Sequence, residues 1–454
     1  MQGMPIAKLT SLYRLFLILL LLAGCAAPPA PAGPTATPDL LDPLQAAATG
    51  TAEAQTSLQV IALSPTATLA VVTLEASATA EPVTPTAAPT DTPSGPQAVH
   101  GIILFIGDGL GEYHRLGAQW LAQGQAAPLA MDSLPIRGYQ TTAAADRAVT
   151  DSAAAATAIA TGVTTNYTAL GVDVNNVPLS TILEQAQELG WAVGLVTNDR
   201  LAGATPGAFA AHVPNREMYL EIARQMLGHE IDVLLGGGED DFTLGTDDGC
   251  GDQPGHRGDA SLVQNAIDSG YTFVCTAAEL AAVDTAATDK LLGLFADDVM
   301  TAPTDPPLAE MTRVAIEILS RDPNGFFLMV ENAHVDHFSH DMMAAEALRA
   351  VLELNAAVVQ AQVYALGAPD TLIMVTGDHE TGGMSLNLDG ARLGINQDAL
   401  AMPDGTAFYV NWAGGSHTGV HIPVTAQGPY SDRLTGEYPN TWLYDVMRAA
   451  MLGE

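Results

Sequence analysis

The sequence predicts an α/β protein in which helices sandwich a mostly parallel central sheet. The first observation is a set of short runs that are apolar throughout, at 101–106, 191–196, 231–235, 326–330 and 371–375. The second is that helical patterns separate these runs, at 181–189, 308–319 and 343–365. Strands that are apolar on both faces and alternate with helices are typical of a parallel sheet covered on both sides. Ligands in such sheets bind beyond the carboxyl ends of the strands.

The amino terminus has the pattern of an export signal. Lys8 and Arg14 precede an apolar run at 15–22 that is too short to span a bilayer comfortably. The run leads into Leu22-Ala23-Gly24-Cys25, which resembles the lipobox of bacterial lipoproteins. We expect residues 1–24 to be removed as a signal peptide and Cys25 to be lipidated. The protein would then be held by membrane lipid at the cell envelope, with its folded part outside the cytoplasm. An ordinary secretory signal is the alternative.

Residues 25–98 have the composition of a disordered tether. They are rich in Pro, Thr and Ala and contain almost no aromatic residues, so they cannot bury enough apolar surface to offset chain entropy. We therefore expect the folded domain at 99–454, with an insertion around 238–290. Within that insertion Cys250 and Cys275 are predicted to form a disulfide, because an exported protein meets oxidising conditions. Two free thiols are the alternative.

Length and charge limit the classes of function. With 454 residues, 48% of them hydrophobic, the chain can bury a large core. Its 51 acidic residues outnumber 16 basic ones and give a formal net charge of −35. Such a charge repels nucleic-acid backbones, so the sequence predicts no nucleic-acid-binding surface.

Three acidic residues follow three of the predicted strands. Asp108, Glu331 and Asp378 each stand just past an apolar run, so distant parts of the sequence can converge at one edge of the sheet. Glycines on both sides of Asp108 would let the backbone turn sharply while the carboxylate faces outward, which suits a metal ligand. The glycine spacing there does not fit a dinucleotide-binding motif, because Glu112 stands where its last glycine would be.

Further ligand-type side chains follow these strands. Asp336 and His340 lie four residues apart, so on a helical turn both face one side, as in a zinc site. His379 adds an imidazole directly after Asp378, and His417 adds another. This density of carboxylates and imidazoles predicts a metal-dependent hydrolase.

A serine at the mouth of an alanine-rich helix would supply the nucleophile. Asp151 and Ser152 precede the run 153–158, which consists of strong helix formers. A side chain at a helix amino terminus feels the positive end of the dipole, which stabilises an alkoxide and binds phosphate. Simple N-capping by Asp151 or Ser152 is the alternative, and it is compatible with catalysis.

The candidate ligands other than His340, together with Asp151 and Ser152, lie in six motifs that resemble those of the bacterial alkaline phosphatase family, from residue 101 to the carboxyl end. The motifs are Ile-Gly-Asp-Gly at 106–109, Thr-Asp-Ser-Ala at 150–153, Ala-Thr-Pro at 204–206 followed by His-Val-x-x-Arg at 212–216, Val-Glu-x-x-x-x-Asp-His at 330–337, Gly-Asp-His-Glu-Thr-Gly-Gly at 377–383 and His-Thr-Gly at 417–419. They occur in the order that the family has.

The resemblance implies an alkaline-phosphatase-like fold and hydrolysis of small phosphate monoesters through a phosphoserine at Ser152, with Arg216 holding two phosphate oxygens. It also implies two zinc ions and one magnesium ion. One zinc would be held by Asp336, His340 and His417, the other by Asp108, Asp378 and His379, and magnesium by Asp108, Thr205 and Glu331. Members of the family are commonly dimers, so the resemblance allows a homodimer.

Some positions depart from the family pattern or carry weaker expectations. Gly203 stands where many members have an aspartate that orders magnesium-bound water, so the magnesium site would be weaker or would use other waters. His337 stands where members have lysine or histidine and is expected to contact phosphate through water. Asp151 is expected to support the phosphate site. His334, Glu380 and His421 lie close to ligands in the sequence and are expected to support them.

Two other functions stay open. Phosphodiesterases of the same superfamily usually have a threonine nucleophile and lack the third metal set, so Ser152, Thr205 and Glu331 favour monoesters. A lipoprotein that binds phosphate or metal without catalysis belongs to a different class. The complete set of nucleophile, ligands and arginine argues against it.

Overall fold

The computed structural model describes residues 98–246, 250–251 and 253–454. The predicted signal peptide, Cys25 and the predicted tether up to residue 97 lie outside the described residues. In the part of the chain that is described, no helix is both long enough and apolar enough to cross a membrane.

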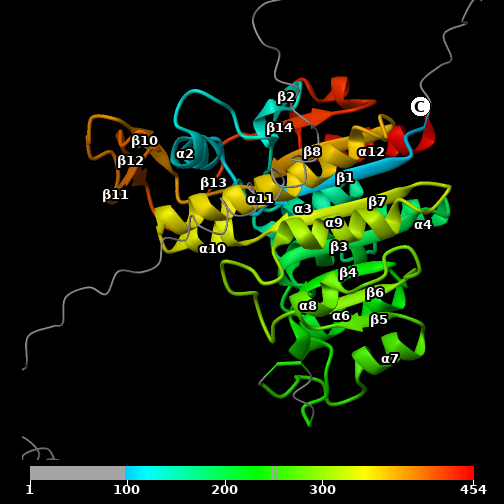
Figure 1. Cartoon of the computed structure of the whole chain (residues 1–454). Coiled ribbons are helices and arrows are strands. Elements are labelled where there is room, and N and C mark those ends of the chain that lie inside the picture. The colour runs from blue at the N-terminus through cyan, green and yellow to red at the C-terminus, as the bar shows by residue number, and fades with distance from the viewer. Residues whose placement is uncertain (1–97, 247–249, 252) are drawn as a thin grey trace, which may run out of the picture. The chain divides into compact units, whose positions relative to one another are not determined.

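A ten-stranded sheet forms the centre of the folded domain that the structure describes (Figure 1). Its spatial order is β15-β2-β14-β8-β1-β7-β3-β4-β6-β5. In chain order the strands are β1 (Gly101–Gly107), β2 (Ile136–Thr141), β3 (Ala192–Arg200), β4 (Val233–Gly237), β5 (Thr272–Val274), β6 (Leu291–Leu294), β7 (Phe326–Asn332), β8 (Thr371–Gly377), β14 (Ile422–Gln427) and β15 (Gly436–Pro439).

The sheet is mixed but mostly parallel. From β8 to β5 every neighbouring pair of strands is parallel, whereas β14 runs antiparallel to both β8 and β2. The prediction of a mostly parallel sheet is therefore confirmed. The sequence pattern did not indicate the antiparallel strand, because strand direction depends on the long connection that precedes β14.

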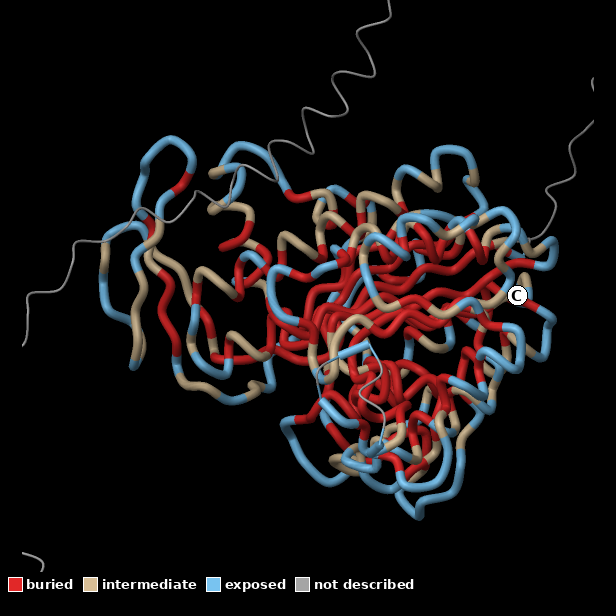
Figure 2. The backbone as a smooth tube through the Cα atoms, turned by 60° about the horizontal axis from the view of Figure 1, so that its bottom comes forward, coloured by how far each residue is buried: buried red, intermediate tan, exposed pale blue. Residues whose placement is uncertain are grey.

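Two helical layers cover the two faces of this sheet. Along β1, Ile102, Leu104 and Ile106 pack into one hydrophobic core, while Ile103 and Phe105 pack into the other. The first core also takes side chains from α3 (Ser152–Thr161), α4 (Ile182–Glu188), α5 (Ala204–Ala210), α6 (Tyr219–Gly228), α7 (Leu262–Asp268) and α12 (Thr441–Leu452). The second takes them from α2 (Glu112–Gln123), α8 (Ala277–Ala281), α9 (Leu308–Leu319), α10 (His334–His340) and α11 (Ala344–Ala365). Figure 2 shows the buried strands enclosed by exposed loops.

Smaller elements complete the described part of the chain. A three-stranded antiparallel sheet, in the order β10-β12-β11, lies beside α2 in Figure 1. Its strands are β10 (Ser385–Asn387), β11 (Asn396–Ala401) and β12 (Ala407–Trp412), and a separate pair is formed by β9 (Glu380–Thr381) and β13 (His417–Thr418). Three short 3-10 helices are η1 (Met131–Ser133), η2 (Glu239–Asp241) and η3 (Ser431–Leu434).

A disulfide joins Cys250 to Cys275, as predicted. Cys275 directly follows the edge strand β5, and Cys250 belongs to the long connection between β4 and β5. The crosslink therefore ties that connection to the edge of the central sheet.

Candidate active site

The candidate site begins where three neighbouring strands end. Gly107 at the end of β1 is in register with Asn332 of β7 and with Gly377 of β8. Asp108 and Asp378 come directly after these strands, and Glu331 is the penultimate residue of β7. The register therefore brings the three predicted carboxylates to one edge of the sheet.

The turn after β1 depends on a glycine. Gly109 adopts a φ of 74°, and a β-carbon at this position would lie 2.8 Å from the α-carbon of Asp336. Glycine thus allows the loop that carries Asp108 to pack directly against α10, which carries Asp336.

A first cluster of metal-ligand side chains consists of Asp108, Asp378 and His379. Their ligand atoms all lie within 4.8 Å of one another, and all three residues are buried. His379 Nε2 lies 3.3 Å from Asp108 Oδ1 and 3.4 Å from Asp378 Oδ2. Neither of these two carboxylate oxygens accepts a hydrogen bond. Buried carboxylates without donors are costly unless a cation compensates them, so the donor set suits a divalent metal ion.

The shifted pKa values of these three residues also indicate a metal site. Burial, together with the neighbouring Asp378 and Asp336, raises the pKa of Asp108 to about 8. Burial also raises the pKa of Asp378 to about 7 and lowers the pKa of His379 to about 4. His379 is therefore a neutral imidazole at neutral pH, which is the form that binds metals.

A second cluster surrounds Asp336. Its Oδ2 lies 3.1 Å from His340 Nε2, and its Oδ1 lies 3.5 Å from His417 Nε2. The two Nε2 atoms are 3.2 Å apart. Each imidazole has its Nδ1 atom 2.9 Å from a backbone carbonyl, that of Gly415 for His340 and that of Thr150 for His417. Such contacts orient histidine ligands so that Nε2 faces the metal.

The carboxylate of Asp336, in this second cluster, is ionised at neutral pH. Although burial opposes it, hydrogen bonds from His340 and His417 hold the pKa of Asp336 well below its usual range. Burial likewise opposes protonation of His417, but its contact with Asp336 raises the pKa of this imidazole to about 9. His379 stacks on His417 with ring centroids 3.6 Å apart, so the two clusters adjoin.

Ser152 lies between these clusters and an arginine. It is the first residue of α3, and its Oγ atom lies 3.3 Å from His379 Nε2 and 3.4 Å from Arg216 Nη1. Asp151 is the N-cap, because its Oδ1 atom accepts a hydrogen bond from Ala154 N at 3.2 Å. Capping thus falls to Asp151, and the hydroxyl of Ser152 is left facing the clusters.

Arg216 is held next to Ser152 by two contacts. Its Nη1 atom lies 3.4 Å from Asp151 Oδ2, and its backbone N donates to Thr168 O at 2.8 Å. Asp151 therefore has two tasks in the structure, since it caps α3 and also orients the guanidinium.

Thr205 and Glu331 form a third polar group. Thr205 is 1% exposed, and its Oγ1 atom has no hydrogen-bond partner among the described residues. Glu331 accepts a hydrogen bond from Thr197 Oγ1 at 2.6 Å. Burial, followed by the charges of Asp199 and Asp108, raises the pKa of Glu331 well above its usual range. A cation with oxygen ligands would satisfy both groups.

The structure adds a residue that sequence reasoning missed. A β-carbon on Gly203 would lie 3.0 Å from Asp199 Oδ2, so the carboxylate of Asp199 occupies the space next to Gly203. Asp199 also acts electrostatically on Glu331 and on Arg216. Asp199 lies near the carboxyl end of β3. Position at the carboxyl end of a buried strand is also the feature by which the sequence indicated Asp108, Glu331 and Asp378.

His337 and His334, two further predicted residues, lie next to each other and outside the two clusters. His337 packs beside His334, with ring centroids 6.1 Å apart, and among the described residues it makes no polar contact with Ser152 or the two clusters. His334 is held by Asn198 and by Met300 O.

Glu380 and a hydroxyl that sequence reasoning missed lie beside the ligands, whereas His421 lies on the surface. Glu380 accepts hydrogen bonds from Gly383 N and Met384 N, and so fixes the loop after β9. His421 forms an exposed pair with Glu437 at 3.2 Å. Sequence reasoning missed Thr381, whose hydroxyl donates to Asp336 Oδ1 and lies 3.3 Å from His379 Nδ1.

An open cleft of about 380 Å³ adjoins the second cluster. It is lined by Arg147, Val149, Thr150, Tyr167, His340, Ser416 and His417. The guanidinium carbon of Arg147 lies 3.9 Å from the ring centroid of Tyr167, so these two side chains form one wall together.

The hydroxyl of Ser152 lies at a helix amino terminus and faces an arginine and two adjoining sets of metal ligands. Such a hydroxyl is suited to taking an anionic group from an ester. Among the chemistries that use such a centre, phosphoryl transfer matches the planar guanidinium of Arg216 best, because that group pairs with two phosphate oxygens. The fold and the site therefore define a metal-dependent hydrolase of phosphate esters.

Comparison with known proteins identifies the family. The family model for alkaline phosphatase matches residues 99–410. The chain is 34% identical to an alkaline phosphatase of Escherichia fergusonii, over 77% of this chain and 85% of that protein. It is also 34% identical to a streptomycin-6-phosphate phosphatase of Streptomyces griseus, over 79% of this chain and 92% of that protein. The chain belongs to the alkaline phosphatase family and is a phosphomonoester hydrolase.

Solved structures agree with this assignment. The alkaline phosphatase from the Antarctic bacterium TAB5 superposes with a TM-score of 0.66 at 26% identity, covering 78% of this chain and 98% of that one. A cold-active alkaline phosphatase from Shewanella sp. superposes with a TM-score of 0.67 at 27% identity, covering 77% of this chain and 99% of that one. The predicted alkaline-phosphatase-like fold is thereby confirmed.

Proposed function

We propose that this phosphomonoesterase works through a phosphoserine at Ser152, with two zinc ions and one magnesium ion. The observation that carries the proposal is the position of Ser152 Oγ, 3.3 Å from His379 Nε2 and 3.4 Å from Arg216 Nη1. The sequence of the amino terminus supports an exported protein that is held at the cell envelope through Cys25.

The donor sets support the choice of metals. Asp336, His340 and His417 would hold one zinc ion, and Asp108, Asp378 and His379 the other, because zinc prefers a mixture of imidazole and carboxylate. Magnesium prefers oxygen, so Asp108, Thr205 and Glu331 would hold it. Bound divalent cations would neutralise the buried carboxylates and favour the ionised form of a nearby hydroxyl.

The residues of the chain account for both steps of the reaction. Ser152 Oγ gives up its proton and forms a bond to phosphorus while the bond from phosphorus to the alcohol oxygen breaks, and that oxygen takes up a proton as the alcohol leaves. Water then attacks the phosphoserine, which releases inorganic phosphate and restores the serine hydroxyl. The amino terminus of α3 supplies a positive dipole to the phosphate in both steps.

Arg216 is expected to bind the phosphate in the ground state and in the transition state. Replacing Arg216 with alanine should lower kcat/KM by about a hundredfold or more, since two charge-assisted hydrogen bonds would be lost. Inhibition by inorganic phosphate should weaken as well. The matched control is Arg216→Lys, which keeps the charge without the planar fork and should give an intermediate value. Equal kcat/KM values for Arg216→Ala and the wild type would contradict this role.

Asp199 is expected to support the magnesium site in place of a side chain at position 203. Its carboxylate lies beside Gly203 and acts on Glu331, which supports this role. Changing Asp199 to asparagine should weaken magnesium binding by about tenfold, as changes next to metal ligands commonly do. Isothermal titration of the zinc-loaded protein with magnesium would measure it. Asp404→Asn, which removes an equal charge from an exposed loop, is the control and should bind magnesium as the wild type does.

Hydrolysis of p-nitrophenyl phosphate, compared with its bis-ester, tests the proposed function. Protein stripped of metal and reconstituted with zinc and magnesium should prefer the monoester, and chelator should abolish the activity. Preference for the diester would support a phosphodiesterase, and metal binding without turnover would support a non-catalytic lipoprotein. The same assay on membrane and soluble fractions of the native host tests the anchor at Cys25.

A further inference from the structure

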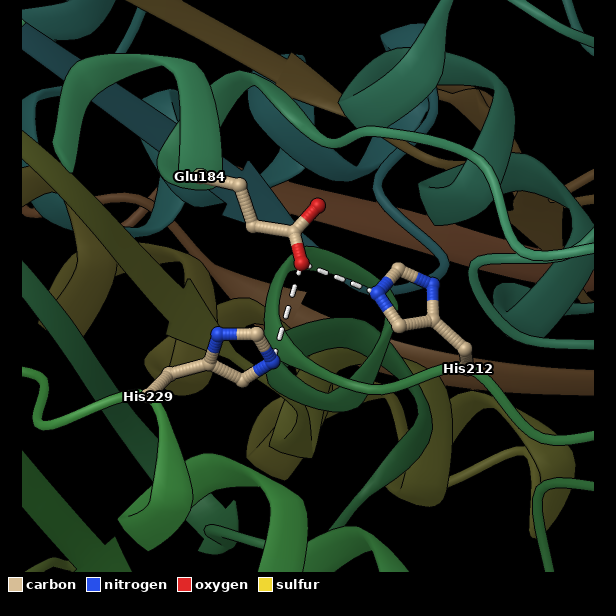
Figure 3. Close-up of side chains that lie close together, drawn as sticks. All are labelled: Glu184, His212 and His229. Carbon is tan, nitrogen blue, oxygen red and sulfur yellow. Dashed lines mark hydrogen bonds and ion pairs between the residues drawn. The ribbon is translucent and has the colours of Figure 1, made fainter. Parts of the chain in front are cut away.

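A separate cluster of metal-ligand side chains lies outside the candidate active site. It consists of Glu184, His212 and His229, whose ligand atoms all lie within 4.8 Å of one another. Figure 3 shows the two imidazoles pointing toward the same carboxylate. The three residues come from different elements: Glu184 from the first turn of α4, His212 from the segment after α5, and His229 from the C-cap of α6.

The distances in this cluster suit a metal ion. Glu184 Oε1 lies 2.9 Å from His212 Nε2 and 3.6 Å from His229 Nε2. Zinc binds imidazole nitrogen and carboxylate oxygen at about 2.0–2.2 Å, so neighbouring ligands in a tetrahedral site lie about 3.3 Å apart. The two observed distances fall on either side of that value.

The orientation of His212 is determined by the backbone. Its Nδ1 atom lies 2.7 Å from Gly171 O and so donates a proton to that carbonyl, which leaves Nε2 directed at Glu184. The backbone N of His212 donates to Gln225 Oε1 at 2.8 Å. A histidine that donates from one nitrogen to a carbonyl and turns the other outward has the arrangement usual for a metal ligand.

Glu184 and His229 are also held in place. Glu184 Oε2 accepts a hydrogen bond from Thr181 N at 2.8 Å, so its second oxygen, Oε1, is the one that meets both imidazoles. The backbone oxygen of His229 accepts from Gln187 Nε2 at 2.7 Å. At 3.6 Å the Nε2 atom of His229 is too far from Glu184 for a hydrogen bond, yet it faces the same point. A proton on His212 would satisfy one imidazole only, whereas a cation would satisfy all three groups.

We propose that Glu184, His212 and His229 form a structural site for a divalent transition metal of the zinc class, distinct from the active-site metals. All three side chains are partly exposed, so water can complete the coordination. The site would link α4, α6 and the segment that leads from α5 to Arg216. It would thus stabilise the part of the chain that carries the phosphate-binding arginine.

Zinc content measured on the full chain tests the proposal. Wild type, His229→Gln and Glu184→Gln would be dialysed against the same buffered free zinc concentration, and zinc per chain would be counted by mass spectrometry. Wild type should bind one equivalent of zinc more than either variant. Added zinc should also raise the unfolding temperature of wild type more than that of either variant. His421→Gln, which removes an exposed imidazole elsewhere, should keep the wild-type content.

The outcomes separate this site from the active site. The test compares the zinc content of wild type with that of each variant. Zinc bound at the active site is common to all of them and cancels in this difference. Equal zinc content in wild type and both variants would overturn the proposal and leave an ion pair between His212 and Glu184. A similar loss in His421→Gln would also overturn it, because zinc would then be binding surface histidines in general.

Discussion

Replacing Ser152 with alanine is expected to lower kcat for phosphate monoesters by more than about a thousandfold, as removal of a catalytic nucleophile does in other hydrolases. Ser152 Oγ is the hydroxyl that lies within 3.4 Å of both Arg216 and His379. The ligand carboxylates and imidazoles are untouched by the change, so metal content should stay at the wild-type value. Steady-state kinetics and metal analysis on the same preparation would measure both.

A buried serine elsewhere provides the control for that variant. Ser431 is 6% exposed, belongs to η3 and donates a hydrogen bond to the backbone oxygen of Gly428, which is part of neither cluster. Ser431→Ala should therefore keep its turnover. Wild-type kcat in Ser152→Ala would remove the assignment of the nucleophile. Loss of metal in that variant would mean that Ser152 acts as a ligand instead.

Metal-free protein is expected to lose stability as the pH rises from about 6.5 to about 8. Burial, with help from neighbouring carboxylates, raises the pKa of Asp108 to about 8, and burial raises that of Asp378 to about 7. In the unfolded chain both groups titrate near pH 4. Within this window the folded state therefore holds more protons than the unfolded state, so the free energy of unfolding falls as the pH rises.

The lower limit of the window comes from the buried histidines. Burial lowers the pKa of His379 to about 4, so this imidazole is neutral in the folded state. Below about pH 6.5 the unfolded state takes up more protons at such a residue, and its contribution has the opposite sign. Above that pH the carboxylates dominate.

Unfolding temperatures at pH 6.5 and pH 8, with chelator and with zinc plus magnesium, would measure this effect. Bound cations replace the protons on the carboxylates, so the metal-loaded protein should show a much smaller change. Asp108→Asn is the matched variant, since it removes the titrating group, and its metal-free form should lose less stability over the same range. A metal-free wild type that is as stable at pH 8 as at pH 6.5 would contradict the expectation.

Much of the fold could be predicted because local sequence patterns specify it. The apolar runs at 101–106, 326–330 and 371–375 became β1, β7 and β8, and the helical pattern at 308–319 became α9. Helix position follows from the period of apolar residues, and buried strands follow from runs that are apolar on both faces. The three acids beyond β1, β7 and β8 could be found for the same reason.

Other features could not be predicted because they depend on distant neighbours. Nothing near Asp199 in the sequence indicates that its carboxylate fills the space next to Gly203. The segment before α3 allowed either Asp151 or Ser152 to be the cap, and the backbone conformation decided for Asp151. The water-mediated phosphate contact expected of His337 stays a prediction, and the structure adds only that its ring lies beside that of His334.

The sequence by itself determined the class of fold and the residue types available for catalysis, because hydrophobic period and ligand chemistry are local properties. Tertiary structure decided which of those residues meet. Parallel register brings Asp108 and Asp378 to one edge, and the packing of α5 against both α4 and α6 brings His229 to Glu184. Convergence of this kind depends on strand pairing and helix packing between segments far apart in the chain, which no local pattern records.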